Sequence, residues 1–351
     1  MPRITALYAA HPEGPGGPRD WRMTLGQILV AVETDDGVRG IGVGGGGPVG
    51  VYLVHTILCP LLLGQELDSI KDIERLWERM YRDTLAYGRK GLAIMAISGV
   101  DLALWDALGH SQGKSVATLL GGPRQSKLPC YATTRDPAAA VQQGFTAVKL
   151  GLAGGGPDEA IKLIAETRRR IGPGIKLMTD AWGQWSFDES LRAAQRLAEY
   201  DLTWLEEPLP PDDHEGYARL SELSPVPIAG GEHEYTVRGF RELAKLKAHP
   251  IWQPDVCWTG GLTQLKAIYA LAAEEGTRVI PHRGGEVWSL HAIAALDSEP
   301  LAESGRPWMT WIEGQPPIQD GHIEVPDLPG FGVTVREDVE ALLQKARSAH
   351  G

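Results

Sequence analysis

The chain has 351 residues, 43% hydrophobic and 23% charged, a balance that suits a soluble protein with a sizeable core. Its net charge of −11 disfavours nucleic acid as a partner, because phosphate binding needs a basic surface. The three cysteines lack metal-ligand spacing, no signal-peptide pattern begins at Met1, and the apolar stretch near 53–63 is too short to span a bilayer. We therefore expect a cytoplasmic protein without a membrane partner.

The first 125 residues have the pattern of a small α+β unit. An alternating segment at 27–34, the Asp-Gly turn at 35–37 and VRGIGVG predict a β-hairpin. Helical patterns follow at 68–84 and 91–110. The glycine-rich stretches 11–20 and 44–50 are expected to be irregular, either as mobile loops that close over a substrate or as plain surface connections.

From Lys127 onward, predicted strands alternate with helical patterns such as 158–171 and 261–276. This alternation favours a parallel sheet, and eight strands favour an α/β fold of the modified (β/α)8 TIM type over an open sheet. We predict a capping domain at 1–125, a barrel at 126–317 and a tail at 318–351 that returns to the capping domain. The predicted strands are 127–133, 146–150, 176–182, 203–208, 227–232, 250–256, 278–283 and 309–313.

Three acidic residues recur every 26 positions, each at the downstream end of a predicted strand: Asp180, Glu206 and Glu232. That interval is one strand plus one helix, so neighbouring parallel strands would bring the three carboxylates to one rim of the barrel. Hard oxygen ligands of this kind hold a divalent cation such as Mg²⁺. The sequence therefore predicts one magnesium ion per subunit.

Other predicted strands also end in a charged or titratable residue. Asp255 and His282 end neighbouring strands, so Asp255 would hold the imidazole tautomer and make His282 a general base near neutral pH. The alternative is that Asp255 caps a helix and His282 packs under a loop. A cation beside the pair would grip a substrate carboxylate and stabilise the charge left when a proton leaves the adjacent carbon.

Four further residues are candidates for substrate contact or catalysis, each with a structural alternative. Lys149 would stabilise a substrate carboxylate or an enediolate oxygen, or is a solvated strand end. Glu313 would donate a hydrogen bond to the same intermediate, or pair with a rim cation. His233 would contact substrate or donate a proton, or support the metal ligands from behind. Arg283 would meet a substrate anion, or form an ion pair at its strand end.

Several motifs together resemble the mandelate racemase branch of the enolase superfamily. They are AISGVDLALWD (96–106), Lys149, the three spaced acids, WQPDVCWTGGLTQL (252–265) and PHRGG (281–285). The resemblance implies a capping domain over a modified barrel, one Mg²⁺ and a homo-oligomer built from dimers. Enolase-superfamily sites use a Lys or His base with Mg²⁺ stabilising the intermediate, so that mechanism is implied by the likeness.

Within that branch, GEHEYT (231–236) and QPDVCWTGGLT (253–263) are most similar to the L-rhamnonate dehydratases and related acid-sugar dehydratases. The likeness implies that His282 removes the proton alpha to the carboxylate of a small anionic sugar acid and that a 2-keto-3-deoxy acid forms. Racemases of the branch carry a second lysine where this chain has Gly151, which favours dehydration over racemisation. The N-terminal segment is shorter than in rhamnonate dehydratases, and His11 would either replace their substrate-contacting histidine or be disordered.

Two alternatives remain open at this stage. An epimerase or cycloisomerase of the same superfamily would share the metal and His282 but give a product isomeric with its substrate. A non-catalytic barrel would keep the fold and need none of the rim residues.

Overall fold

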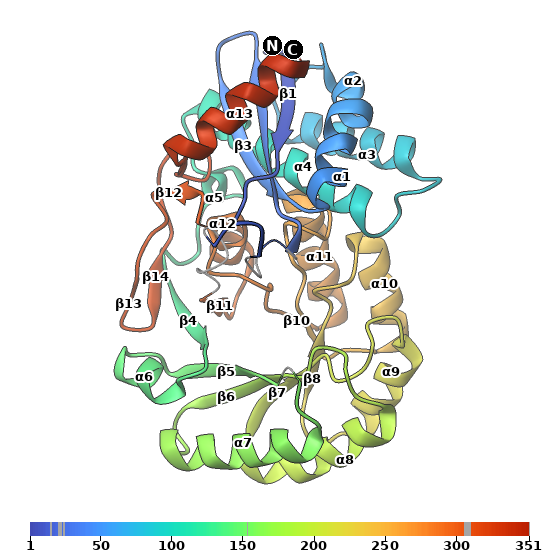
Figure 1. Ribbon diagram of the computed structural model, residues 1–351, viewed down its shortest axis with the longest axis vertical. Helices are drawn as coiled ribbons and strands as arrows, with labels where there is room; N and C mark the ends of the chain where they lie inside the picture. The colour runs from blue at the N-terminus through green and yellow to red at the C-terminus, as the bar shows by residue number, and fades with distance from the viewer. Residues whose placement is uncertain (15, 20–22, 24, 153, 305–309, 351) are drawn as a thin grey trace.

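The computed structural model describes residues 1–351 except 15, 20–22, 24, 153, 305–309 and 351, and it has two parts (Figure 1). The N-terminal part and the last helix lie at one end of the molecule, and a sheet surrounded by helices lies at the other (Figure 1). The three cysteines are free and buried.

The capping domain is an antiparallel sheet covered by helices. The strand order is β1-β2-β3, and the β2–β3 pairing confirms the predicted hairpin. The predicted helices at 68–84 and 91–110 are confirmed as α3 and α4. The elements are β1 (Ile4–Ala10), β2 (Ile28–Thr34), β3 (Arg39–Gly44), α1 (Gly47–Leu53), a π-helical turn (Val54–Leu58), α2 (Cys59–Leu62), α3 (Ile70–Thr84), α4 (Leu92–Gln112) and α5 (Val116–Leu119), with a 3-10 turn at Gly17–Arg19.

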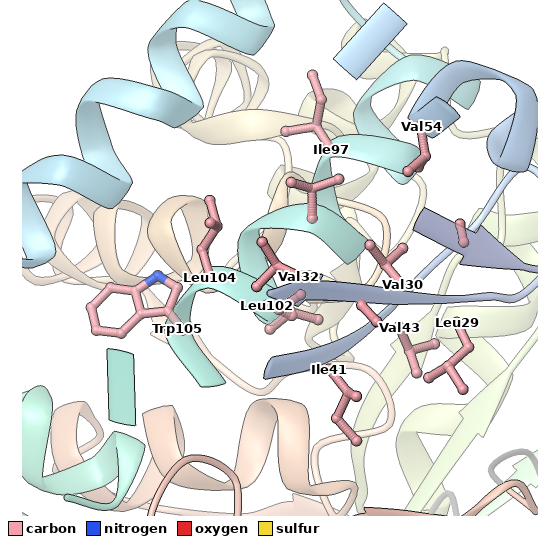
Figure 2. Close-up of a cluster of buried hydrophobic side chains, with 14 of the residues drawn as sticks. Leu29, Val30, Val32, Ile41, Val43, Val54, Ile97, Leu102, Leu104 and Trp105 are labelled. Atoms are coloured by element: carbon pink, nitrogen blue, oxygen red, sulfur yellow. The ribbon is translucent and has the colours of Figure 1, made fainter. Parts of the chain in front are cut away.

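Helix α4 packs directly on β3 because alternate positions of that strand are glycine. A Cβ added at Gly40, Gly42 or Gly44 would lie 2.2–2.5 Å from a backbone oxygen of α4. Val30 and Val32 of β2 point toward α4, whereas Leu29, Ile41 and Val43 point to the other face of the sheet (Figure 2). By length and composition α4 could cross a membrane, but 89% of its most apolar window is buried inside the protein, as in a core helix.

The prediction that 44–50 is irregular is wrong. Strand β3 runs to Gly44, and α1 begins at Gly47 with Pro48 in its first turn. Proline suits that position because its missing N–H would have no helical partner there. The stretch is therefore a strand-to-helix junction packed against α4, where Gly45 N donates to Met95 O at 3.1 Å.

The barrel contains eight parallel strands within the described residues. Strands β4 to β10 pair in chain order, and β11 pairs with β4 on the other side. The strands are β4 (Lys127–Thr133), β5 (Ala147–Gly151), β6 (Lys176–Asp180), β7 (Leu202–Glu206), β8 (Ile228–Gly230), β9 (Ile251–Trp252), β10 (Arg278–Val279) and β11 (Ala302–Glu303). Gly285 N donates to Glu303 O at 2.6 Å and links the segment after β10 to β11.

A helix follows each of the first seven barrel strands, as a (β/α)8 fold requires. Apolar faces of these helices pack on the strands in one continuous core. The helices are α6 (Pro137–Gln142), α7 (Pro157–Ile171), α8 (Phe187–Leu197, followed by a 3-10 turn at Ala198–Tyr200), α9 (His214–Leu223), α10 (Thr236–Leu246), α11 (Gly261–Glu275) and α12 (Val287–Leu296).

The eighth barrel strand is not the predicted segment 309–313. That segment supplies β12 (Ile312–Glu313), which pairs with β15 (Thr334–Val335) in a separate two-stranded sheet, and Met309 lies outside the described residues. The aromatic and β-branched content of 309–313 favoured a strand there. The true eighth strand, β11, has two residues and is too short to show any periodicity.

The C-terminal tail contacts both parts of the protein. Strands β13 (Ile318–Gln319) and β14 (His322–Glu324) form a hairpin, and β14 pairs antiparallel with β4 of the barrel. Helix α13 (Glu337–His350) then lies along β1, so both chain ends are close together (Figure 1). Ion pairs of 2.8 Å from Arg39 to Glu340 and from Arg347 to Glu33 join this helix to the cap sheet.

Candidate active site

The three spaced acids lie at one rim of the barrel. Strand β6 ends at Asp180, β7 ends at Glu206, and Glu232 follows β8 by two residues. Asp180 and Glu206 are direct neighbours in the parallel register. The strand geometry thus brings the predicted carboxylates to the same end of three adjacent strands.

The negative charges of these three acids repel one another. Burial raises the pKa of Asp180 well above its usual value, and the nearby charge of Glu206 raises it further. Burial also raises the pKa of Glu232, despite the opposite effect of His282. Carboxylates that are buried together in this way fit a site for a divalent cation, because such a cation offsets both burial and repulsion.

A second cluster shares Glu232. Among the residues that the structure describes, Glu207, Glu232 and His233 form a group whose ligand atoms all lie within 4.8 Å of one another. Glu207 and His233 are already paired, with Oε2 and Nδ1 2.8 Å apart. These two residues therefore already balance each other's charge.

His282 and Asp255 form the predicted pair. The His282 Nδ1 lies 2.9 Å from Asp255 Oδ2, and its Nε2 lies 3.4 Å from Glu232 Oε2 on the acid rim. Both side chains are almost fully buried, and the Trp258 ring lies against the imidazole, with centroids 5.9 Å apart. Burial lowers the pKa of His282, but Glu232 and Asp255 outweigh it and raise the pKa to about 10.

Lys149 is not a solvated strand end, because its ammonium is buried between two carboxylates. Its Nζ lies 2.7 Å from Glu206 Oε1 and 3.0 Å from Glu303 Oε1. Trp204 Nε1 and Gln253 Nε2 donate to the other oxygen of Glu206 at 2.8 and 2.7 Å. Lys149 therefore supplies fixed positive charge directly beneath the acid rim.

Glu303, at the end of β11, is the site residue that sequence reasoning missed. Thr133 Oγ1 donates to its Oε1, and the Arg283 backbone N–H donates to its Oε2 at 2.7 Å. Burial opposes ionisation, but Lys149 and His282 lower the pKa of Glu303 to about 2. The only available signal was its own charge at the end of the short apolar run 300–302.

Glu313 does not take part in this site. It is exposed in β12, outside the barrel sheet, and the acid at the end of the eighth barrel strand is Glu303, which pairs with Lys149. The error follows directly from the misplaced eighth strand.

The remaining predicted residues lie in different settings. His233 is partly exposed, and its Nε2 lies 3.7 Å from Glu232 Oε1, while its bond to Glu207 fits the supporting alternative. Arg283 forms the ion pair that was its alternative, with 97% of its side chain buried against Asp255 and Glu286. His11 is half-buried in the cap, near Gly47.

Known proteins share this architecture over nearly the whole chain. Residues 22–121 match the mandelate racemase / muconate lactonizing enzyme N-terminal domain, and residues 133–339 match the enolase C-terminal domain-like family. The L-rhamnonate dehydratase of Saccharopolyspora erythraea is 40% identical, over 90% of this chain and 85% of its own length.

Two solved structures show the same fold. Rhamnonate dehydratase from Gibberella zeae complexed with Mg has a TM-score of 0.88 at 30% identity and covers 98% of this chain and 96% of that one. The 3,6-anhydro-D-galactonate cycloisomerase from Zobellia galactanivorans has a TM-score of 0.85 at 32% identity and covers 98% of this chain and 99% of that one. The chain therefore belongs to the mandelate racemase and muconate lactonizing enzyme branch of the enolase superfamily.

Proposed function

We propose that the protein is a magnesium-dependent dehydratase of an acid sugar such as L-rhamnonate. The observation that carries the proposal is the placement of His282, with Asp255 on Nδ1 and Nε2 turned toward Glu232 on the acid rim. This is the arrangement of a general base beside a cation site. The L-rhamnonate dehydratase of Saccharopolyspora erythraea and the rhamnonate dehydratase of Gibberella zeae, both similar to this chain, favour the same reaction.

Asp180, Glu206 and Glu232 would hold the Mg²⁺. When bound, the ion grips the substrate carboxylate and stabilises the negative charge that develops when the neighbouring carbon loses its proton. Lys149, which Glu206 and Glu303 hold in place, adds positive charge beneath the same oxygens.

His282 performs the proton transfers. In the neutral ring, Nδ1–H would donate to Asp255, and Nε2, which is turned toward the acid rim, would take the proton from the carbon alpha to the carboxylate. A cation at the acid rim would offset the charge of Glu232, so Glu232 would stabilise the imidazolium less and the pKa of His282 would be lower. The imidazolium then donates its proton to the departing 3-hydroxyl as the C3–O bond breaks. Water leaves, and the enol product tautomerises to the 2-keto-3-deoxy acid.

The position at which racemases of the branch carry a second lysine is a glycine in this chain. Gly151 stands two residues beyond Lys149 and presents no side chain there. His282 therefore transfers protons on one face of the substrate, which favours elimination over racemisation. Because one structural relative is a cycloisomerase, isomerisation of the substrate is the competing proposal.

A screen of mono- and di-acid sugars with Mg²⁺ tests the proposal. We expect a 2-keto product from at least one substrate, detected as its semicarbazone, and loss of this activity with EDTA. An isomeric product without 2-keto acid would support the epimerase or cycloisomerase instead. Absence of alpha-proton exchange in deuterated solvent, for every acid in the screen, would support a non-catalytic barrel.

The setting and assembly are parts of the same proposal. We expect the protein to be cytoplasmic and to form a homo-oligomer. Light scattering after size-exclusion chromatography would measure its oligomeric state.

A further inference from the structure

We propose that Arg283 is a positioning residue that aligns the two halves of the active site, His282 with Asp255 on one side and Glu303 with Lys149 on the other. The inference rests on the proposed function in taking His282 as the base. It concerns a residue that sequence reasoning assigned either to a substrate anion or to a simple ion pair.

The guanidinium of Arg283 contacts both oxygens of Asp255 through two of its nitrogens, one of which also lies 2.9 Å from Oδ2. Its Nε donates to Oδ2 at 3.0 Å, and one terminal nitrogen donates to Oδ1 at 3.1 Å. His282 Nδ1 is bonded to the same Oδ2 at 2.9 Å. A planar fork fixes the carboxylate plane as well as its position, and that plane decides where the imidazole points.

The backbone of Arg283 organises the other half of the site. Its N–H donates to Glu303 Oε2 at 2.7 Å, while the other oxygen of Glu303 lies 3.0 Å from Lys149 Nζ. Arg283 has φ of +53°, a left-handed conformation that glycine adopts far more readily. A large side chain held in that conformation marks a position where the surroundings impose the geometry, as occurs at functional sites.

The rest of the guanidinium is enclosed. Arg283 Cζ lies 5.5 Å from the centroid of the Trp258 ring, which also flanks His282. Another terminal nitrogen lies 3.8 Å from Glu286 Oε2, and the side chain is only 3% exposed. The fork is thus locked in place behind the base, where it orients Asp255 without touching substrate.

Arg283→Gly separates the fork from the backbone. Glycine accepts the left-handed φ and keeps the N–H to Glu303, so the variant removes the side-chain contacts to Asp255, Glu286 and Trp258 and leaves the backbone contact in place. We expect kcat to fall about 10- to 100-fold, as for other residues that orient an active-site ligand from behind, with little change in KM. Arg283→Lys keeps the charge but loses the two-point geometry, so its kcat should lie between those of Arg283→Gly and the wild type.

A matched control is Arg168→Lys. Like Arg283, Arg168 donates several hydrogen bonds from its guanidinium, but it lies on α7 away from the rim. Its acceptors are the backbone carbonyls of Tyr200, Gly172, Ile175 and Asp201. This variant should lower the melting temperature and leave kcat unchanged. Unchanged kcat in Arg283→Gly, or a raised KM at unchanged kcat, would overturn the positioning role, the latter because it indicates direct substrate contact.

A spectroscopic readout keeps this test independent of the proposed reaction. In protein with ¹⁵N-labelled histidine, the Nδ1–H resonance of His282 is identified by its disappearance in His282→Asn. We expect this resonance to broaden or shift in Arg283→Gly and to persist in Arg168→Lys. If the wild type dehydrates no acid sugar, the proposed function fails; if the resonance is the same in Arg283→Gly and wild type, the positioning role fails.

Discussion

The interface between β3 and α4 in the cap differs from the barrel rim in what it buries: the first buries apolar groups and backbone, the second buries charged side chains. Between β3 and α4, glycines at 40, 42 and 44 remove side chains so that two backbones can touch, and the surrounding core is apolar. At the rim, buried carboxylates face one another and rely on Lys149, Arg283 and His282 for compensation. The cap residues thus serve close packing, whereas the buried charges of the rim serve the proposed reaction.

The comparison implies that changes at the rim should abolish turnover with little effect on folding, and changes in the cap should do the reverse. The rim acids repel one another, so replacing one of them relieves that repulsion and need not unfold the protein, whereas removing one partner of a buried ion pair costs stability. At β3, by contrast, no space exists for an added atom.

His282→Asn should have the largest effect. Loss of the base removes the general acid-base contribution, so we expect kcat to fall by at least about 10² to 10⁴-fold while folding and Mg²⁺ binding persist. Steady-state kinetics and calorimetric titration with Mg²⁺ would measure this. Wild-type turnover in the variant would reject His282 as the base.

Glu206→Gln should weaken both the metal site and the charge beneath it. The amide is a poorer ligand and leaves Lys149 with Glu303 as its remaining carboxylate partner, so we expect roughly 100-fold lower Mg²⁺ affinity and a parallel loss of activity. Titration of activity against Mg²⁺ would test it. Full activity at the wild-type metal requirement would show that Glu206 is no ligand.

Glu303→Gln and Glu313→Gln distinguish the true eighth strand from the predicted one. Glu303 is buried against Lys149, so its neutralisation should lower kcat about 10- to 100-fold. The exposed Glu313 serves as the control and should leave kcat unchanged. Equal effects of the two substitutions would contradict the assignment.

Gly42→Ala should damage the cap rather than the chemistry. Its Cβ would lie 2.3 Å from Gly99 O, and relieving that overlap should cost about 1–3 kcal/mol of unfolding free energy. Urea unfolding would measure the loss, with Gly174→Ala, which meets nothing within 4 Å, as the matched control. An unchanged midpoint in Gly42→Ala would show that α4 does not pack directly on β3.

His291 should produce the smallest effect, a loss of stability in mild acid. Its Nδ1 accepts from Ala117 N at 3.1 Å and its Nε2 donates to Phe331 O at 3.2 Å, so the neutral ring is fully bonded at the contact between barrel, cap and tail. Burial lowers the pKa of His291 from 6.5 to about 4.

Because the folded pKa is below the unfolded one, the stabilisation is present above about pH 6.5 and is lost as pH falls toward 4. Between about pH 7.5 and 5.5 the expected loss is roughly 1 kcal/mol, at 1.36 kcal/mol per pKa unit. Urea unfolding at both pH values, in wild type and His291→Gln, isolates this contribution as the difference between their pH dependences. Identical pH dependences would show that His291 is not held neutral.

The sequence alone determined the features that repeat along the chain. The interval between Asp180, Glu206 and Glu232 is that of one strand and one helix, and parallel neighbours necessarily bring such residues to one rim. Asp255 and His282 each follow one of two consecutive strands, β9 and β10, which made their contact predictable for the same reason.

Only the tertiary structure decided which groups compensate one another across the barrel. Glu303 lies in a two-residue strand without periodicity. It pairs with Lys149, which is 154 positions earlier in the chain. The tail hairpin joins the barrel sheet and α13 joins the cap, although neither pairing leaves a local pattern. Local periodicity records the direction of a strand, whereas long-range charge pairing depends on how the chain closes into a barrel.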